Sequence, residues 1–188
     1  QLHTTEEKMQ IRACLYRCAA VGLKVNYALN QAILESDSQM QAILTDDVKS
    51  FRRHPAIISW YIAEDPGGNG VSPSKLQAAY DTLKQLDPYR PVAIVAMPKS
   101  NLSEYASSFD VLLSNPYPVP NLPIDYTGST IETACTMFGG GLTKPVWISA
   151  QAFGGHSGRL REPSMSEMRI QPYLAIIHGA RGVQYFKR

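Results

Sequence analysis

Two adjacent carboxylic acids, Glu64 and Asp65, directly follow an apolar run and stand directly before Pro66. A carboxylic acid can protonate a leaving oxygen, while a second carboxylate can attack carbon or activate a water molecule. Three more polar side chains follow apolar runs in the same way, namely Asn115, Tyr117 and Gln151. Joint chemistry by these groups requires a fold that brings the ends of several apolar runs together.

Apolar runs alternate with helical patterns along the chain. Strands are predicted over residues 23–29, 56–63, 91–97, 111–115, 145–153 and 182–186. Helices are predicted over 5–21, from the N-cap Thr45 to before Pro55, from Ser72 to about Leu86, near 102–108, over 130–138 and over 164–178. Near-continuous apolar strands separated by helices indicate an α/β fold with a parallel sheet covered by helices.

Two parallel α/β architectures fit this spacing, a doubly wound sheet and a (β/α)8 TIM barrel. No Gly-x-Gly-x-x-Gly follows a strand, which weakens the dinucleotide-binding version, and the polar residues at strand ends favour the barrel. A barrel needs eight strands and about 250 residues, whereas 188 residues supply six predicted strands. We therefore expect one barrel domain over residues 1–188, a fragment covering strands three to eight. The start at Gln1 rather than methionine fits a piece of a larger chain or assembly.

The composition excludes several classes of protein. Charged residues make up 18% and hydrophobic residues 44%, and the net charge is +2. A disordered tail and a nucleic-acid partner are therefore not expected, and no apolar run reaches the roughly 20 residues that span a membrane. The three cysteines make no disulfide framework, and no Cys–His cluster has zinc spacing, so no metal or other cofactor is expected.

Five motifs carry a resemblance to a known family. Residues 54–66, HPAIISWYIAEDP, resemble the fourth-strand motif of glycoside hydrolase barrels, the superfamily of cellulase-like and β-galactosidase-like enzymes. Four further motifs resemble later parts of these barrels in the same order. They are LDPYRPV at 86–92, the D…NPYP pattern at 110–118, KPVW at 144–147 and the GARGVQYF ending at 179–186. The resemblance covers nearly the whole chain and implies the (β/α)8 barrel.

The resemblance implies glycosidic bond cleavage, with a carboxylic acid at the end of strand four as general acid/base. The family order is Asp-Glu-Pro or Asn-Glu-Pro, whereas this chain has Glu64-Asp65-Pro66. Alternation along the strand places Asp65 on the interior face, so we predict Asp65 as the general acid and Glu64 as its assistant. The Asp65 side chain is one methylene shorter than glutamate, and a misplacement of about 1 Å can cost about 100-fold in rate. Glu64 could take over only at a kinked strand end, and a merely solvated acidic pair is the other interpretation.

A second departure concerns strand seven, where the retaining enzymes of this superfamily carry a nucleophilic glutamate. No Asp or Glu occurs over residues 142–161, and Gln151 is the candidate for the equivalent place. A neutral amide can hydrogen-bond a sugar hydroxyl or a water but cannot form a glycosyl ester. Three explanations remain open. The second carboxylate comes from elsewhere, such as Asp125 or the absent strands; or the acetamido group of the sugar serves as nucleophile beside Glu64 and Asp65; or catalysis is lost.

The substrate-binding candidates are polar and aromatic residues at or beyond strand ends, since aromatic faces suit sugar C–H surfaces as well as protein cores. They are Asn115, Tyr117, Gln151, Phe153, Tyr185 and His156. The predicted function is hydrolysis of glycosidic bonds in an oligo- or polysaccharide at the C-terminal mouth of the barrel. The alternative is a non-catalytic carbohydrate-binding or extracellular matrix protein on a degenerate barrel. The resemblance and the sequon at Asn101 indicate a secreted or extracellular location.

Overall fold

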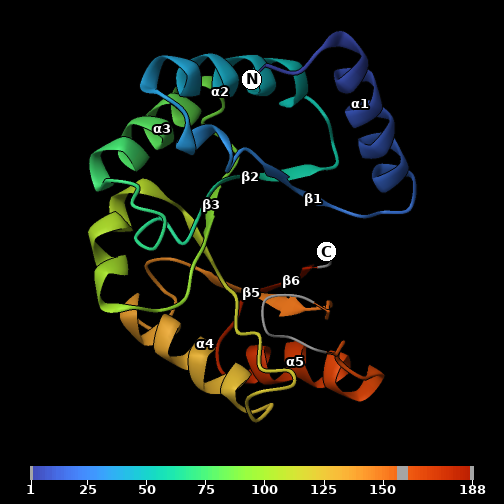
Figure 1. Ribbon diagram of the computed structural model, residues 1–188, viewed down its shortest axis with the longest axis vertical. Helices are drawn as coiled ribbons and strands as arrows, with labels where there is room; N and C mark the ends of the chain where they lie inside the picture. The colour runs from blue at the N-terminus through green and yellow to red at the C-terminus, as the bar shows by residue number, and fades with distance from the viewer. Residues whose placement is uncertain (1, 156–160, 187–188) are drawn as a thin grey trace. The chain divides into compact units, whose positions relative to one another are not determined.

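The computed structural model describes residues 2–155 and 161–186. Helices and strands alternate along the chain (Figure 1). The elements are α1 Thr5–Ala20, β1 Val25–Ala28, η1 Ala32–Leu34, α2 Asp37–Phe51, β2 Ile57–Glu64, α3 Pro73–Leu86, β3 Val92–Val95, η2 Ser100–Ser108, β4 Val111–Ser114, α4 Tyr126–Met137, β5 Val146–Gln151, α5 Met165–Ile177 and β6 Gly182–Phe186. Each predicted strand is confirmed to within a few residues. The contacts divide the chain into two compact units, one reaching Ile94 and including Glu104–Asp110, the other formed by Val95–Ser103 and the chain from Val111 onward.

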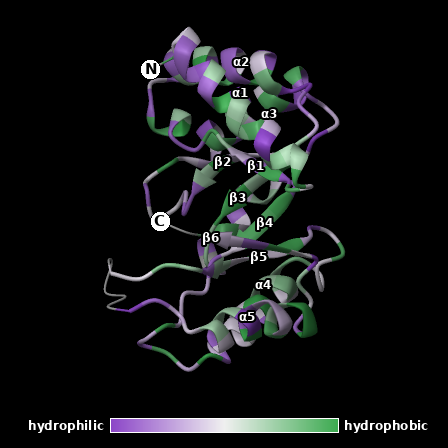
Figure 2. Cartoon of the chain, turned by 90° about the vertical axis from the view of Figure 1, so that its right-hand side faces the viewer, coloured by the Kyte–Doolittle hydropathy of each residue, from purple (hydrophilic) through white to green (hydrophobic). Residues whose placement is uncertain are grey.

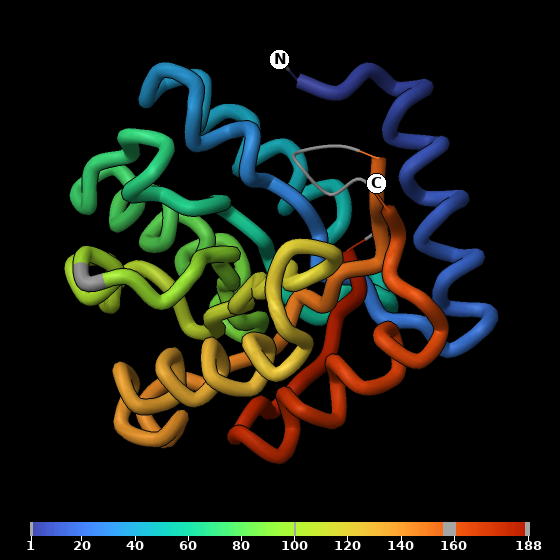
Figure 3. Tube along the Cα trace, turned by 60° about the horizontal axis from the view of Figure 1, so that its bottom comes forward, coloured from blue at the N-terminus to red at the C-terminus, as the bar shows by residue number. Residues whose placement is uncertain are grey.

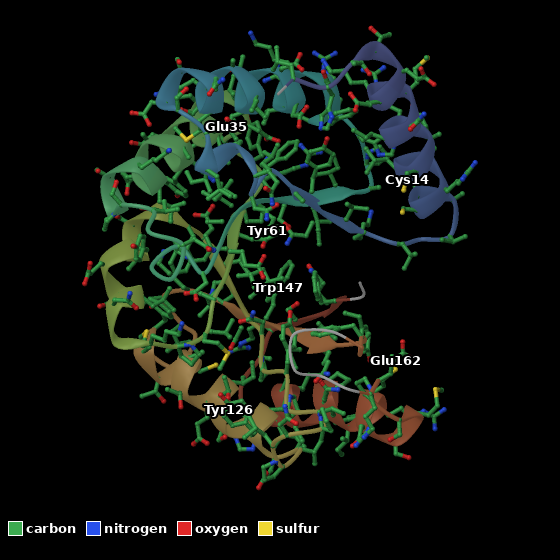
Figure 4. All side chains as sticks on the ribbon, in the orientation of Figure 1. Cys14, Glu35, Tyr61, Tyr126, Trp147 and Glu162 are labelled. Carbon is green, nitrogen blue, oxygen red and sulfur yellow. The ribbon has the colours of Figure 1, made fainter. Side chains whose placement is uncertain are left out.

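The first unit contains β1, β2 and β3 in that order. β1 pairs in parallel with β2, with Tyr27 opposite Trp60, and α2 and α3 pack side by side (Figures 1 and 3). Trp60 is fully buried and lies edge-on to Tyr27 at 5.6 Å, and its indole N–H donates to Asp87 at 3.1 Å, as expected of a core residue. Tyr61 lies on the opposite face of β2, away from α2 and α3 (Figure 4). Trp60 and Tyr61 thus lie on opposite faces of β2, as alternation along a strand requires.

The second unit contains β4, β5 and β6 in that order. β5 pairs in parallel with both neighbours, with Ile148 opposite Ser114 on one side and Gln151 opposite Phe186 on the other. The helices α4 and α5 pack on each other and on β5. Every residue of β3 and of β4 is buried, and both strands are predominantly apolar (Figure 2). Strands of this kind are covered on both faces, as in parallel α/β folds.

The predicted helix start at Thr45 is wrong. α2 begins at Asp37, directly after Ser36, and Thr45 lies inside the helix. The structure shows the reason, because Met40, Leu44, Val48 and Phe51 are all buried and form one continuous apolar stripe at helical spacing.

Four other helices test the predicted boundaries. α4 begins at Tyr126, four residues before the predicted range, and residues near 102–108 form the 3₁₀ helix η2. The predicted start at Ser72 is confirmed, because its hydroxyl accepts a hydrogen bond from the Lys75 N–H at 3.3 Å. Ser164 caps α5 in the same way, and the Glu167 carboxylate accepts a hydrogen bond from the Ser164 N–H.

Candidate functional site

The chain leaves the direction of β2 abruptly at Asp65. Its φ is 36°, a left-handed conformation that Asp and Asn adopt more readily than other non-glycine residues. The following loop is closed by hydrogen bonds from the Asn69 N–H to the Asp65 carbonyl oxygen at 2.9 Å and from the Val71 N–H to that of Pro66 at 2.9 Å. The Asn69 side chain also donates to the Glu64 carbonyl oxygen at 2.6 Å. The end of β2 is therefore kinked, and its loop is held by its own hydrogen bonds.

The Asp65 carboxylate lies directly over Gly68. A Cβ atom at Gly68 would stand 2.3 Å from Asp65 Oδ2 and 2.7 Å from Asp65 Cγ, so only glycine leaves room for the carboxylate. The Glu64 side chain is exposed, whereas Asp65 is half-buried. The kink thus places the two neighbouring carboxyl groups in different environments. It meets the condition under which the sequence allowed Glu64 to take over, and the division of roles between the two stays a prediction.

Tyr105 on η2 forms a hydrogen bond to the end of the same loop. Its hydroxyl donates to the Val71 carbonyl oxygen at 2.7 Å. Burial raises the pKa of Tyr105, and the nearby carboxylates of Glu104 and Asp65 raise it further. The phenol therefore stays protonated and keeps its hydrogen bond, which fixes the distal end of the loop that carries Asp65.

Gln151, at the end of β5, is fully buried, and its side-chain amide is used completely by the backbone. Its Oε1 accepts a hydrogen bond from the Val119 N–H at 3.0 Å. Its Nε2 donates to the Val119 carbonyl oxygen at 2.9 Å and to the Phe153 carbonyl oxygen at 3.1 Å. This amide therefore ties the loop after β4 to the end of β5. We call this arrangement the Gln151 latch, and the predicted contact between Gln151 and substrate stays a prediction.

Gln171 on α5 is a second buried amide that sequence analysis missed. Its Oε1 accepts a hydrogen bond from the Gln151 N–H at 3.0 Å, and its Nε2 donates to the Gln151 carbonyl oxygen at 3.4 Å. Gln171 itself is fully buried. A polar residue inside the otherwise apolar run of α5 was the available signal, because a buried amide must find hydrogen-bond partners.

Three aromatic rings gather beside the Gln151 latch. Tyr117 lies edge-on to Phe153 at 4.9 Å and roughly parallel to Phe186 at 6.1 Å, and Phe153 lies edge-on to Phe186 at 5.6 Å. Phe153 is buried and Tyr117 half-buried. Phe186 is half-buried as well, so the rings form a packed cluster around the buried Phe153.

The remaining predicted binding residues lie in different settings. Asn115, at the end of β4, is half-buried, and its Oδ1 has no hydrogen-bond partner within the described residues. Tyr185 on β6 is about half exposed, and its hydroxyl donates to the Met168 carbonyl oxygen at 3.4 Å. His156 lies outside the described residues. The Asn115 Oδ1 is therefore a buried acceptor that the described residues leave unsatisfied.

Glu162 is a carboxylate near the end of β5 that was not among the predicted site residues. It lies one residue beyond the range 142–161, in which no Asp or Glu occurs. A Cβ atom at Gly154 would lie 2.3 Å from the Arg161 carbonyl carbon and 2.4 Å from the Glu162 backbone nitrogen. Gly154, three residues after Gln151 in sequence, therefore leaves room for the backbone of Arg161 and Glu162 to pack against it. The Glu162 side chain is exposed (Figure 4), and Asp125 at the start of α4 is exposed as well.

Residues 2–155 and 161–186 contain neither a metal-binding cluster nor a membrane-spanning helix. No group of three or more His, Cys, Asp and Glu side chains is arranged there to hold a metal ion. In the same residues no helix combines the length and the apolar character needed to cross a bilayer.

Parallel strands connected by helices, with polar groups at the carboxyl ends of the strands, define the class of (β/α) barrel proteins. The chain belongs to the TIM barrel domain family of the family 2 glycosyl hydrolases, whose family model, "Glycosyl hydrolases family 2, TIM barrel domain", matches residues 13–165. The barrel fold and the glycoside hydrolase resemblance predicted from the motifs are thereby confirmed.

Curated relatives match about half of the chain. A β-glucuronidase from Paenibacillus borealis is 31% identical over 93 residues, which cover 48% of this chain and 15% of that protein. The human β-glucuronidase is 29% identical over 101 residues, covering 53% of this chain and 15% of that protein. The aligned part is thus a small fraction of each relative's length.

Solved structures agree on the fold. A β-glucuronidase from an uncultured Clostridium species has a TM-score of 0.62 at 18% identity, covering 93% of this chain and 35% of that one. A putative α-L-fucosidase from Bacteroides thetaiotaomicron has a TM-score of 0.66 at 12% identity, covering 94% and 64%. At these identities the likeness establishes the barrel fold, and the chemistry has to be argued from this chain's own residues.

Proposed function

We propose that this chain carries glycosidase chemistry: hydrolysis of a glycosidic bond in an oligo- or polysaccharide, with the Glu64–Asp65 pair as the source of the general acid/base. The observation that carries the proposal is the kinked end of β2. There, inside the segment matched by the family model, one carboxylate is exposed and its neighbour is held over Gly68.

The division of labour follows from hydrolysis itself. One carboxyl group must be protonated to donate to the leaving oxygen, and a second carboxylate must attack the anomeric carbon or activate water. We assign the role of proton donor to Asp65 and an assisting role to Glu64. Glu162 is our first candidate for the second carboxylate, because Gly154 holds its backbone beside the loop that follows β5.

The substrate class can be narrowed by the relatives. The two curated relatives are β-glucuronidases, so an aryl β-D-glucuronide is the first substrate to assay, with the β-D-galactoside and β-D-glucoside beside it. Asn115 Oδ1 and the Tyr117 ring are the groups in the second unit assigned to sugar binding, through a hydroxyl and a C–H surface respectively.

The Gln151 latch favours a second candidate function. At the end of β5 a neutral, fully bonded amide stands where the resemblance leads one to expect a nucleophile. A barrel with this feature that retains Asn115 and the aromatic cluster would bind carbohydrate without cleaving it. This non-catalytic function is the alternative to hydrolysis.

The deciding experiment measures release of the aglycone and binding of the sugar by the same preparation. Hydrolysis predicts turnover that falls by about 100-fold or more in Asp65→Asn or Glu64→Gln, and that is unchanged in Glu6→Gln, an exposed control on α1. Saturable sugar binding without turnover selects the second function. Turnover that neither Asp65→Asn nor Glu64→Gln alters contradicts the assignment of the acid/base to this pair.

Domain extent and location belong to the same proposal. We take residues 1–188 as part of a single barrel domain whose first two units lie elsewhere in a longer chain or assembly, which fits the 15% share of the relatives' length. An extracellular location is supported by the family resemblance and by the sequon, whose Asn101 is exposed on η2. Expression through a secretory pathway, followed by intact-mass measurement with and without an N-glycosidase, tests that point.

A further inference from the structure

A basic pocket lies in the first unit at the amino-terminal side of β2. It has a volume of about 520 Å³ and is formed by the last turn of α2, the segment that leads into β2, and two residues of α1. A water molecule takes about 30 Å³ in the liquid, so the pocket has room for a polyatomic anion with several waters. Its lining residues are Arg12, Tyr16, Lys49, Ser50, Phe51, Arg52, Arg53, His54 and Pro55.

The lining has four cationic side chains and no carboxylate. Arg12 donates to the Ser50 carbonyl oxygen at 3.2 Å, and Arg52 donates to the Leu86 carbonyl oxygen. Lys49 and Arg53 are exposed. None of the four forms an ion pair with a carboxylate in the part of the chain that the structure describes. Backbone carbonyls are dipoles rather than charges, so the positive charge of the pocket is left without a counterion.

His54 adds an unsatisfied donor to the same lining. Its side chain is buried, with 8% of its surface exposed. Its Nδ1 accepts a hydrogen bond from the Ala56 N–H at 3.2 Å, and a ring nitrogen that accepts carries no proton, so the proton is on Nε2. That Nε2 is buried and has no hydrogen-bond partner within the described residues. A buried donor without an acceptor is costly unless a ligand or ion supplies the acceptor.

We propose that this pocket binds a tetrahedral oxyanion, namely a phosphate or sulfate group, free or as an ester. Arginine side chains present several N–H donors in a planar fork that suits such oxygens, and Lys49 contributes a point charge. His54 belongs to the same lining, and an anion oxygen would give its unsatisfied Nε2–H an acceptor. The anion replaces the missing acceptor of His54 and neutralises charge that the chain itself does not neutralise.

This site is separate from the carboxylate pair. His54 and Pro55 precede β2, whereas Glu64 ends it, and eight strand residues at about 3.3 Å each separate the two ends by roughly 25 Å. The proposal therefore does not depend on the glycosidase assignment, and either can fail without the other.

The test is titration of the protein with inorganic phosphate, sulfate and chloride at constant ionic strength. Isothermal calorimetry gives the affinity, and the ¹⁵N resonance of the His54 ring reports on the pocket itself. We expect saturable binding of phosphate and sulfate in competition with each other, a shift of His54 Nε2, and no such response to chloride. A phosphate monoester and a sulfate ester are then titrated separately. Their affinities, compared with those of the free ions, show whether the pocket takes the oxyanion free or as an ester.

Matched arginine variants locate the binding. Arg53→Gln and Arg12→Gln should each weaken phosphate binding by about tenfold, the effect of one charge-assisted hydrogen bond. Arg17→Gln, an exposed residue of α1 outside the lining, should leave the affinity unchanged. Because Arg53 is exposed, its replacement tests the site without threatening the fold. Equal affinity in Arg53→Gln and the parent protein, a response to chloride equal to that of phosphate, or no saturable binding overturns the proposal.

Discussion

The substitution Gln151→Glu tests two alternative roles of residue 151. Either its amide is needed for the Gln151 latch, or the position is that of a nucleophile whose carboxylate is missing. In the parent protein the amide NH₂ donates to the carbonyl oxygens of Val119 and Phe153 at 2.9 and 3.1 Å. The substitution puts an oxygen about 3 Å from those two carbonyl oxygens. A protonated carboxyl can donate to only one of them, and an ionised carboxylate can donate to neither.

The magnitude follows from these contacts. With the introduced carboxyl protonated, one lost hydrogen bond and one unsatisfied carbonyl together cost about 2 kcal/mol. The position is fully buried, so the pKa of the introduced carboxyl rises by about 3 units or more above the ordinary glutamate value of about 4.3. A carboxyl whose pKa is raised by folding destabilises the protein as pH rises through the interval between those two values. At about 1.36 kcal/mol per unit, the further loss by pH 8 is about 4 kcal/mol.

The assay is urea denaturation at pH 5 and pH 8, compared with the parent protein and with Gln151→Met. The methionine variant also breaks the latch but cannot ionise, so its loss of stability should be the same at both pH values. The glutamate variant should lose several kcal/mol more at pH 8 than at pH 5. The reasoning is refuted by a pH dependence equal to that of the parent protein, or by a gain of glycoside turnover without loss of stability.

Three further substitutions test other contacts. Gly68→Ala places a Cβ within 2.3 Å of the Asp65 carboxylate and should lower glycoside turnover by about 100-fold through displacement of that group, with little effect on stability because Gly68 is exposed. Asp87→Asn should cost about 3 kcal/mol. Although burial acts to raise the pKa of Asp87, hydrogen bonds from its arginine and tryptophan partners hold that pKa below its usual value, so the parent protein should lose stability below about pH 4 and the variant should not. Gly182→Ala sets a Cβ 2.7 Å from the Trp147 ring and should cost about 1–3 kcal/mol by overpacking.

Each of these substitutions has its own control. The displacement of the Asp65 carboxylate can be checked by the ¹³C resonance of its side chain, which Gly68→Ala should shift. An unshifted resonance with full turnover contradicts the argument. For Asp87, identical acid unfolding of variant and parent protein would count against the ion pair. For Gly182, Trp147→Leu should relieve most of the added cost, and a strictly additive double variant would disprove the clash.

The strands were predictable because their apolar runs are bounded by turn residues and by proline. The strand after His54-Pro55 and the capped start of α3 at Ser72 came directly from local chemistry. The start of α2 did not, since Thr45 resembles an N-cap while the stripe that includes Met40 and Leu44 extends the helix toward Ser36. A tertiary contact, the burial of that stripe, decided between two acceptable local starts.

The candidate site was predictable in composition but not in geometry. The positions of Glu64 and Asp65 at the end of a strand followed from the sequence, and so did the absence of a carboxylate at Gln151. The kink at Asp65 did not, because strict alternation assumes that the strand continues. Nor did the contacts of Gln151, since its partners Val119 and Gln171 lie 32 and 20 residues away, and a single sequence carries no record of such pairings.

The left-handed backbone at Asp65 restricts which residues this position can accept. Glycine, asparagine and aspartate tolerate such a conformation, whereas longer side chains such as glutamate reach it only at an energetic cost. A reversion to the family order Asn-Glu-Pro at residues 64–66 would therefore be resisted by the loop from Asp65 to Val71 and by the contact with Gly68. A glutamate at this position would therefore carry a backbone cost of about 1–2 kcal/mol unless the loop changed its conformation with it.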